Sequence, residues 1–143
     1  MKACVPIYHR RKNDGRILKI NIRQLWIVAG IGIIALLWWL SLMRSPPNID
    51  VADGDKYGHL LAYAGTMWWW AQLWPAWKKR LLLAVTLALM GVAIEFAQGA
   101  TGWRTFDVMD MLANSAGVLV GWVLAVTPLG KMLGVIENWQ RAR

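Results

Sequence analysis

Four long apolar stretches constrain the fold of this chain more than any other feature of its sequence. They cover residues 25–43, 60–77, 81–97 and 111–127, and the first contains no charged residue. A helix crosses the hydrocarbon core of a bilayer with about 20 apolar residues, so each stretch is long enough once its flanking turns are added. Since 57% of the 143 residues are hydrophobic, a water-soluble domain fits the composition poorly. The stretches therefore predict an all-α fold, a bundle of four transmembrane helices.

The basic residues predict how this bundle is oriented. Most of the 16 Lys and Arg residues precede the first stretch, separate the second from the third, or follow the fourth. Loops rich in Lys and Arg remain on the cytoplasmic side of a membrane. We therefore expect both termini in the cytoplasm, and we attribute the net charge of +8 to topology rather than to a nucleic-acid partner.

Three parts of the chain follow from this pattern. They are a basic cytoplasmic tail over residues 1–24, a membrane domain over 25–128 and a cytoplasmic C-terminal segment over 129–143. The predicted spans are about 25–43, 57–77, 81–98 and 107–127. Trp68, Trp69, Trp70, Trp74 and Trp77 crowd the cytoplasmic half of the second span, where tryptophan is typical of a membrane interface.

Polar residues interrupt three of the predicted spans, and the topology places all three interruptions at the outer face. At about 100° per residue, Asp55, His59 and Tyr63 share one face of the second span. A charged group that faces lipid costs at least about 2.5 kcal/mol near the bilayer centre, so these side chains should turn inward and pair. We expect an outward-facing polar pocket built from Asp55, Lys56, His59, Tyr63, Glu95, Gln98, Arg104, Asp107, Asp110 and Asn114.

Several of these residues, taken one at a time, can be explained by a structural role. Acids at helix N-termini interact favourably with the helix dipole, and Asn114 is suited to an interhelical hydrogen bond. Gly117 and Gly121 have the small-xxx-small spacing of closely packed membrane helices. Ionisable residues on three converging helix ends nevertheless exceed what capping requires.

A divalent-metal site formed by His59 with Glu95, Asp107 and Asp110 is one alternative, and a role of His59 as proton acceptor is another. No His-x-x-Glu-His spacing supports a metal, and the single cysteine, Cys4, excludes a cysteine-built zinc site, so we predict neither metal nor cofactor.

The polar residues also form an ordered set of motifs. These are Asp55-Lys56-x-x-His59-x-x-x-Tyr63, then Glu95-x-x-Gln98, then Arg104-x-x-Asp107-x-x-Asp110-x-x-x-Asn114-x-x-Gly117. The set resembles VanZ-like membrane proteins from about residue 55 to residue 121, with Leu60 departing from the aromatic residue that often follows the motif histidine. The resemblance implies a multi-pass protein of the bacterial cytoplasmic (inner) membrane, in a family whose founding member is linked to teicoplanin resistance. It does not supply a settled reaction.

Three functions are compatible with these observations. In the first, the pocket binds a cell-envelope component or lipid-linked precursor, with a link to glycopeptide resistance and with His59, Glu95, Arg104, Asp107 and Asp110 as recognition groups. In the second, the protein is a membrane-embedded hydrolase or transferase with Glu95 or His59 as general base, although the sequence shows no activated nucleophile. In the third, it is a small subunit of a transport or envelope complex that contacts another membrane protein. The lipid bilayer is a partner in all three.

Overall fold

All the elements of the computed structural model, which describes residues 21–46 and 52–142, are helical. They are α1 (Ile22–Leu42), α2 (Gly54–Ala71), α3 (Trp77–Ala100), α4 (Val108–Val126), the 3₁₀-helix η1 (Pro128–Lys131) and α5 (Met132–Arg141). The predicted all-α class is therefore confirmed for the described residues. The N-terminal tail through residue 20 lies outside them.

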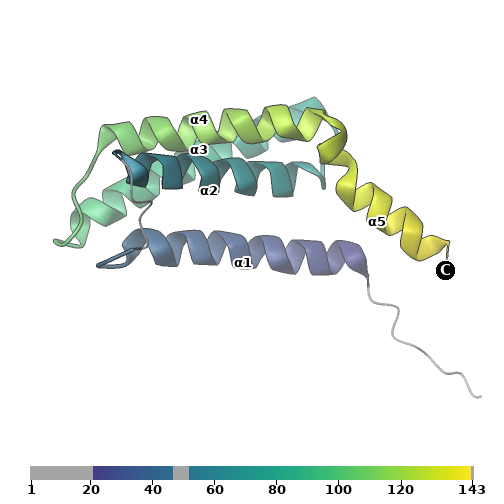
Figure 1. Cartoon of the computed structure of the whole chain (residues 1–143), viewed down its shortest axis with the longest axis horizontal. Helices are drawn as coiled ribbons and strands as arrows, with labels where there is room; N and C mark the ends of the chain where they lie inside the picture. The colour runs from purple at the N-terminus through teal and green to yellow at the C-terminus, as the bar shows by residue number, and fades with distance from the viewer. Residues whose placement is uncertain (1–20, 47–51, 143) are drawn as a thin grey trace, which may run out of the picture.

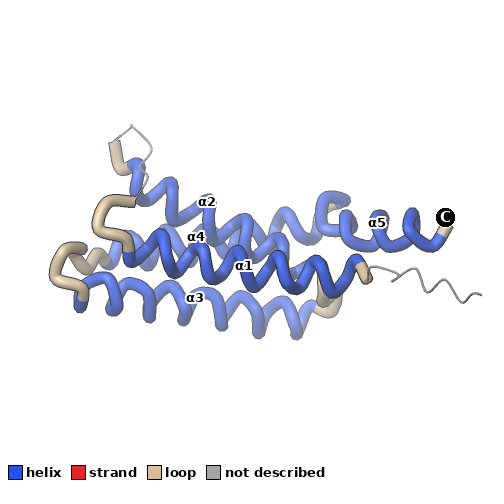
Figure 2. Tube along the Cα trace, turned by 90° about the horizontal axis from the view of Figure 1, so that it is seen from below, coloured by secondary structure: helices blue, strands red, loops and turns tan. Residues whose placement is uncertain are grey.

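The first four helices run back and forth along one common direction (Figures 1 and 2). The end of α1, the start of α2 and the α3–α4 connection lie at one end, which we call the polar end. The start of α1, the α2–α3 connection and α5 lie at the opposite end. Because the helices alternate in direction, the start of α2, the end of α3 and the start of α4 meet at the polar end.

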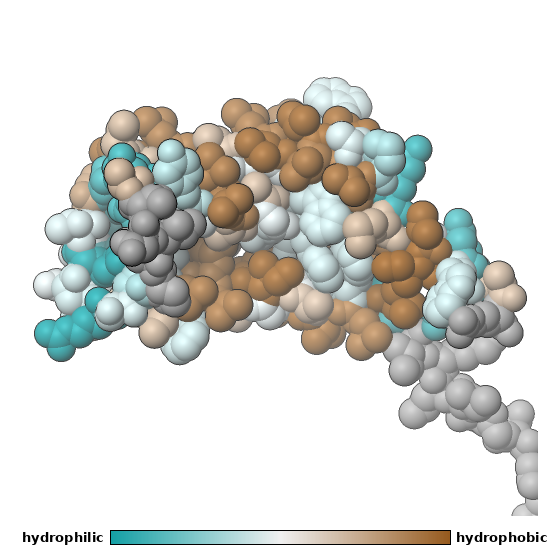
Figure 3. All heavy atoms as spheres, in the orientation of Figure 1, coloured by the Kyte–Doolittle hydropathy of each residue, from teal (hydrophilic) through white to brown (hydrophobic). Residues whose placement is uncertain are grey.

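Three helices, α1, α3 and α4, are long and apolar enough to cross a membrane. The 18-residue α2 falls short by composition, because Asp55, Lys56 and His59 occupy its first turns. Large apolar side chains such as Val28, Leu82 and Leu119 are exposed on the outer surface of the bundle. Figure 3 shows hydrophobic residues gathered over the middle of the molecule, with more hydrophilic residues toward the ends. The chain is therefore a multi-pass membrane protein.

Helices α2 and α4 pack most closely. A Cβ atom at Gly117 would meet the carbonyl oxygen of Leu60, and one at Gly121 would meet that of Ala64. The predicted small-xxx-small contact is thus present, and its partner is the backbone of α2. Tyr63 and Met67 are fully buried beside it. This contact fixes the register of α2 relative to α4 along their common direction, and hence which of their polar residues lie side by side.

The tryptophans of α2 do more than the sequence predicts. Trp69 stacks on Trp26 of α1 with ring centroids 3.8 Å apart, and each indole N–H donates to the other residue's carbonyl. Trp70 is buried, whereas Trp77 is 63% exposed. The interpretation of the whole cluster as an interfacial anchor is therefore wrong for Trp69 and Trp70, because their rings pack between helices.

Helix boundaries differ from the expected spans where local chemistry ends a helix. The second helix ends at Ala71 rather than near residue 77, and Pro75 lies in the connection that follows. Proline removes a backbone donor and cannot continue a helix interior. Trp77 consequently begins α3.

The C-terminal segment contains the helix α5, which the sequence reasoning does not anticipate. Leu133 on this helix is buried, and its N–H donates to Oε1 of Gln72 at 2.9 Å. Glu137 lies 3.9 Å from the guanidinium of Arg23 at the start of α1. These contacts hold α5 against the end of the bundle opposite the polar end.

Candidate functional site

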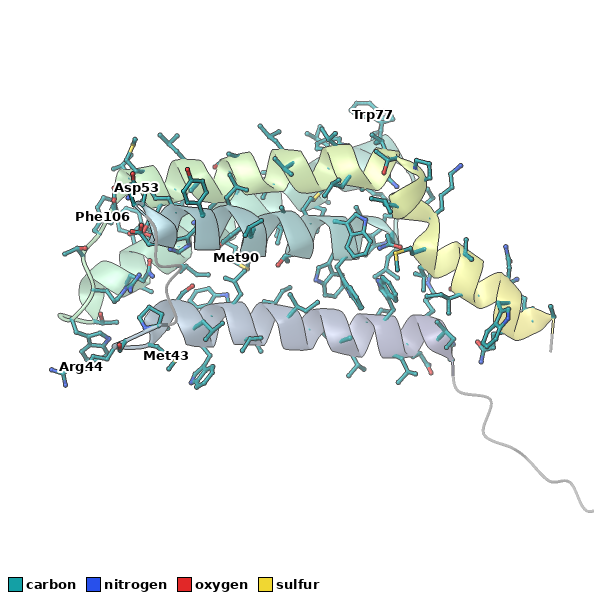
Figure 4. All side chains as sticks on the ribbon, viewed as in Figure 1. Met43, Arg44, Asp53, Trp77, Met90 and Phe106 are labelled. Atoms are coloured by element: carbon teal, nitrogen blue, oxygen red, sulfur yellow. The ribbon has the colours of Figure 1, made fainter. Side chains whose placement is uncertain are left out.

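The structure divides the ten predicted pocket residues into two groups at the polar end. One group lines a cavity of about 380 Å³, and the other packs beside or beneath it. The cavity-lining group consists of Asp55, His59, Tyr63, Gln98 and Arg104. The second group consists of Lys56, Glu95, Asp107, Asp110 and Asn114. The side-chain view in Figure 4 labels Asp53 and Phe106, which mark this end of the bundle.

The cavity lies between the end of α1, the start of α2 and the end of α3. Leu37 and Leu40 supply an apolar wall from α1, while Ser41 and Arg44 supply polar groups near its end. Gln98 reaches it from α3, and Arg104 reaches it from the α3–α4 connection. Helix α1 therefore contributes a wall that the sequence motifs, which begin at residue 55, do not contain.

Side chains from α3 and from the α3–α4 connection contact the C-terminal end of α1. Nε2 of Gln98 donates to the carbonyl of Ser41 at 2.8 Å, and Nε1 of Trp103 donates to the carbonyl of Leu42 at 3.3 Å. The last four carbonyls of a helix lack partners within the helix. Gln98 and Trp103 satisfy two of them, and in doing so they join the end of α1 to α3 and to the α3–α4 connection.

Arg44 and Arg104 are the cavity's unpaired cations. Within residues 21–46 and 52–142, neither guanidinium forms an ion pair or a hydrogen bond. Arg44 is exposed, and Figure 4 shows it extending from the polar end, whereas Arg104 is half-buried. An arginine presents a planar fork of donors that matches a carboxylate or a phosphate.

Lys56 is placed differently from the two arginines. Its ammonium lies 3.2 Å from a carboxylate oxygen of Asp53, and 3.6 Å from one each of Asp55 and Asp107. This cation therefore joins the start of α2 to the start of α4. Its single positive charge offsets part of the negative charge of these three acids at the rim of the polar end, while the arginines remain available to a ligand.

A fully buried acid, Glu95, links α3 to the first turn of α4. Its Oε1 accepts the backbone N–H of Asp107 at 2.6 Å. Asp107 in turn caps α4 by accepting the N–H of Met109 at 2.8 Å. The second oxygen of Glu95 has no hydrogen-bond partner among the described residues. Glu95 also lies within electrostatic range of Asp110 and His59.

His59 connects the two groups of residues. It lines the cavity, and its Nε2 lies 3.4 Å from Oδ2 of Asp110. Deeper in the bundle, Asn114 is fully buried, and neither atom of its amide has a partner among the described residues. Tyr63 is also fully buried, with its hydroxyl unpartnered among those residues. In the described part of the chain, no three His, Cys, Asp or Glu side chains are arranged to hold a metal ion.

Sequence reasoning missed Arg44 and Asp53 as parts of this site. Asp53 precedes α2 in a left-handed conformation with φ of 56° and contacts Lys56. One sequence feature could have identified Arg44 as a site residue, because it is among the few cations predicted on the outer side. Its place in the cavity depends on the contacts between α1 and α3, which no local pattern encodes.

The fold and the site define a class: a small helical multi-pass membrane protein with ionisable residues gathered at one end of its bundle. The family described as VanZ/LLP1 matches residues 35–131, which is more than half of the chain. The chain therefore belongs to the VanZ/LLP1 family, as the motif resemblance predicts. No curated protein and no solved structure matches it.

Proposed function

We propose that this VanZ-like protein resides in the bacterial inner membrane, crosses it four times with both termini in the cytoplasm, and uses its outward cavity to bind an anionic cell-envelope component. The polar end then faces outward. Binding of a lipid-linked precursor at this face offers a physical route to the glycopeptide resistance that the family resemblance implies.

The proposed topology has four spans, so α2 must cross the membrane in addition to α1, α3 and α4. Helix α1 ends at the polar end and α3 begins at the opposite end, so α2 carries the chain back through the same thickness (Figure 1). Its 18 residues extend about 27 Å at 1.5 Å per residue, close to the thickness of a hydrocarbon core. Lys78 and Lys79 follow α2 at the end opposite the cavity, which supports a cytoplasmic position for that end.

The proposed binding rests on one observation: the guanidinium groups of Arg44 and Arg104 line one cavity, and neither forms an ion pair or a hydrogen bond within the described residues. A volume of about 380 Å³ is within the range of small-molecule sites. Water screens the half-buried Arg104 less than it screens the exposed Arg44, so Arg104 should attract an anion more strongly. Gln98, Ser41 and His59 line the same space and supply further polar contacts.

Removal of the arginines tests this proposal. We expect Arg104→Ala to weaken binding of an anionic lipid about tenfold or more, because a charge-assisted hydrogen bond contributes roughly 1.5–3 kcal/mol. Arg44→Ala should weaken binding less, and the double variant should lose binding. The measurement is native mass spectrometry of protein in nanodiscs that contain zwitterionic lipid and a titrated fraction of phosphatidic acid.

Lys79→Ala is the matched control, because it removes an exposed cation at the opposite end of the bundle. Its binding should equal that of the wild type. Equal lipid occupancy in the wild type and in the double arginine variant would contradict the proposed function. Arg104→Lys should recover only part of the affinity, since lysine keeps the charge but lacks the planar fork.

A further inference from the structure

His59 lies where the cavity meets the buried carboxylates. Its ring lines the cavity, while its Nε2 faces Oδ2 of Asp110 at 3.4 Å. The side chains of His59 and Asp110 are only 12% and 5% exposed. A buried carboxylate behind a histidine holds the imidazole in one orientation and stabilises the imidazolium that forms when the ring accepts a proton. The pair is therefore suited to proton transfer within the cavity.

The charge of the cavity favours one class of ligand. A phosphate monoester carries a charge of about −1.5 to −2 at neutral pH, and the two guanidinium groups of Arg44 and Arg104 balance a charge of that size. Asp55 also lines the cavity, and its carboxylate lies 3.6 Å from the ammonium of Lys56. Lys56 is shared with Asp53 and Asp107, so it offsets only part of this negative charge, and the two arginines remain the cations without an ion-pair partner among the described residues. A phosphate diester carries a single negative charge and would leave one arginine without a partner.

Apolar side chains continue the cavity wall beside these charges. Leu37 and Leu40 of α1 and Ala62 of α2 line it. Trp39 and Leu61 on the same two helices are exposed on the outer surface of the bundle. A ligand with a phosphate head and a hydrocarbon tail therefore matches both parts of the cavity. A phospholipid of the surrounding bilayer has such a phosphate head and hydrocarbon tail.

We propose that the cavity hydrolyses the phosphate monoester of a membrane lipid, with His59 as the general base and Asp110 as a positioning residue. This inference rests on the proposed binding of an anionic envelope component. His59 accepts a proton from a water molecule as the water oxygen forms a bond to phosphorus, and the bond between phosphorus and the lipid oxygen breaks. The departing alkoxide takes a proton from a second water molecule. The hydroxide so formed recovers the proton held by His59, leaving a lipid alcohol and inorganic phosphate.

The test measures lipid binding and phosphate release separately on the full chain in nanodiscs. The probes are phosphatidic acid and a long-chain polyprenyl monophosphate, with glycerol phosphate as a water-soluble monoester. We expect the wild type to release phosphate from at least one of the two lipids and not from glycerol phosphate. His59→Gln should lower the release rate at least 100-fold, since general base catalysis typically contributes 10²–10⁴-fold. Its lipid occupancy should fall less than threefold.

Chemical rescue separates a catalytic role of His59 from a structural one. In His59→Gly, added imidazole should restore phosphate release, which recovery of folding alone would not explain. Asp110→Asn should lower kcat with little change in KM, and Asp110→Glu should recover part of the rate. Lys79→Ala should behave as the wild type.

Each outcome decides the question. Binding of both lipids without phosphate release would overturn the inference and leave the proposed function standing. If the wild type binds neither lipid, both the inferred hydrolysis and the proposed binding function are contradicted. Equal release by wild type and by folded His59→Gln, or failure of imidazole to restore His59→Gly, would exclude His59 as the base. Release from glycerol phosphate at the rate seen for the lipids would overturn the assignment to lipid.

Discussion

A single carboxylate, that of Glu95, joins α3 to α4 at the depth where the polar residues meet. It is fully buried, one oxygen accepts the N–H of Asp107, and the other has no partner among the described residues. A buried polar group without a partner is costly, and the cost is larger for a charged one. The fold tolerates Glu95 because its hydrogen bond satisfies the backbone N–H of Asp107 at the start of α4, a donor that would otherwise lack this acceptor.

Substitution of Glu95 should reveal this role. Glu95→Ala leaves the N–H of Asp107 without its acceptor, and we expect a loss of about 1–3 kcal/mol in the free energy of unfolding. Glu95→Gln keeps an oxygen at the same position and should lose less than half as much. Unfolding in detergent micelles, followed by circular dichroism, measures both. Leu89→Ala changes a 64% exposed residue on the same helix and serves as the control. Equal stability of Glu95→Ala and Leu89→Ala would contradict the role assigned to Glu95.

Among the elements, the pairing of α2 with α4 sets the register of the site. Gly117 and Gly121 lie against the backbone of α2, so α4 approaches it without intervening side chains. This approach brings Lys56 to Asp107 and His59 to Asp110. Packing in lipid depends on such close contacts, because no hydrophobic force drives helices together there.

Adding one methyl group at this contact should separate the two helices. Gly117→Ala places its Cβ against the carbonyl of Leu60, and we expect destabilisation by about 1–3 kcal/mol, as for other overpacked sites. Gly65→Ala is the matched control, since a Cβ there meets no atom and alanine favours the helix. The midpoint of thermal unfolding compares them. An unchanged midpoint for Gly117→Ala, or an equal fall for both variants, would refute the close approach of α2 and α4.

At the scale of elements, much of the fold can be predicted from local pattern. The apolar stretches predict the first four helices, and the glycine spacing predicts that α4 packs closely. The end of α2 is missed because Pro75 ends that apolar stretch earlier than composition alone indicates. The short helix α5 is missed because its apolar contacts, such as Leu133 near Gln72, become visible only in the folded chain.

The site is predictable only in part, for the same reason. Helical periodicity and topology place Asp55, His59 and Tyr63 on one face and at one end, and the structure keeps them together on the cavity. Arg44 lies outside the motifs, and its position depends on the hydrogen bond from Gln98 to the end of α1. Local pattern also does not distinguish Lys56, which contacts three carboxylates, from Arg104, which contacts none among the described residues.

Across the whole molecule, an apolar middle separates two chemically different ends (Figure 3). The polar end gathers acids, His59 and the two cavity arginines from four helices and their connections. The opposite end carries the stacked Trp26 and Trp69 and the contacts of α5. Ionisable groups are costly in lipid, so their convergence at one end lets them pair with one another and with water instead of with hydrocarbon.

The side of the membrane on which the polar end lies is the central claim, and thiol labelling in intact cells tests it most directly. In a Cys4→Ser background, Thr105→Cys places a single thiol at the polar end and Lys78→Cys places one at the opposite end, both at exposed positions. A membrane-impermeant maleimide should label the Thr105→Cys protein in intact cells, and the Lys78→Cys protein only after the membrane is disrupted. The reverse pattern, or labelling of both proteins from outside, would contradict an outward-facing cavity.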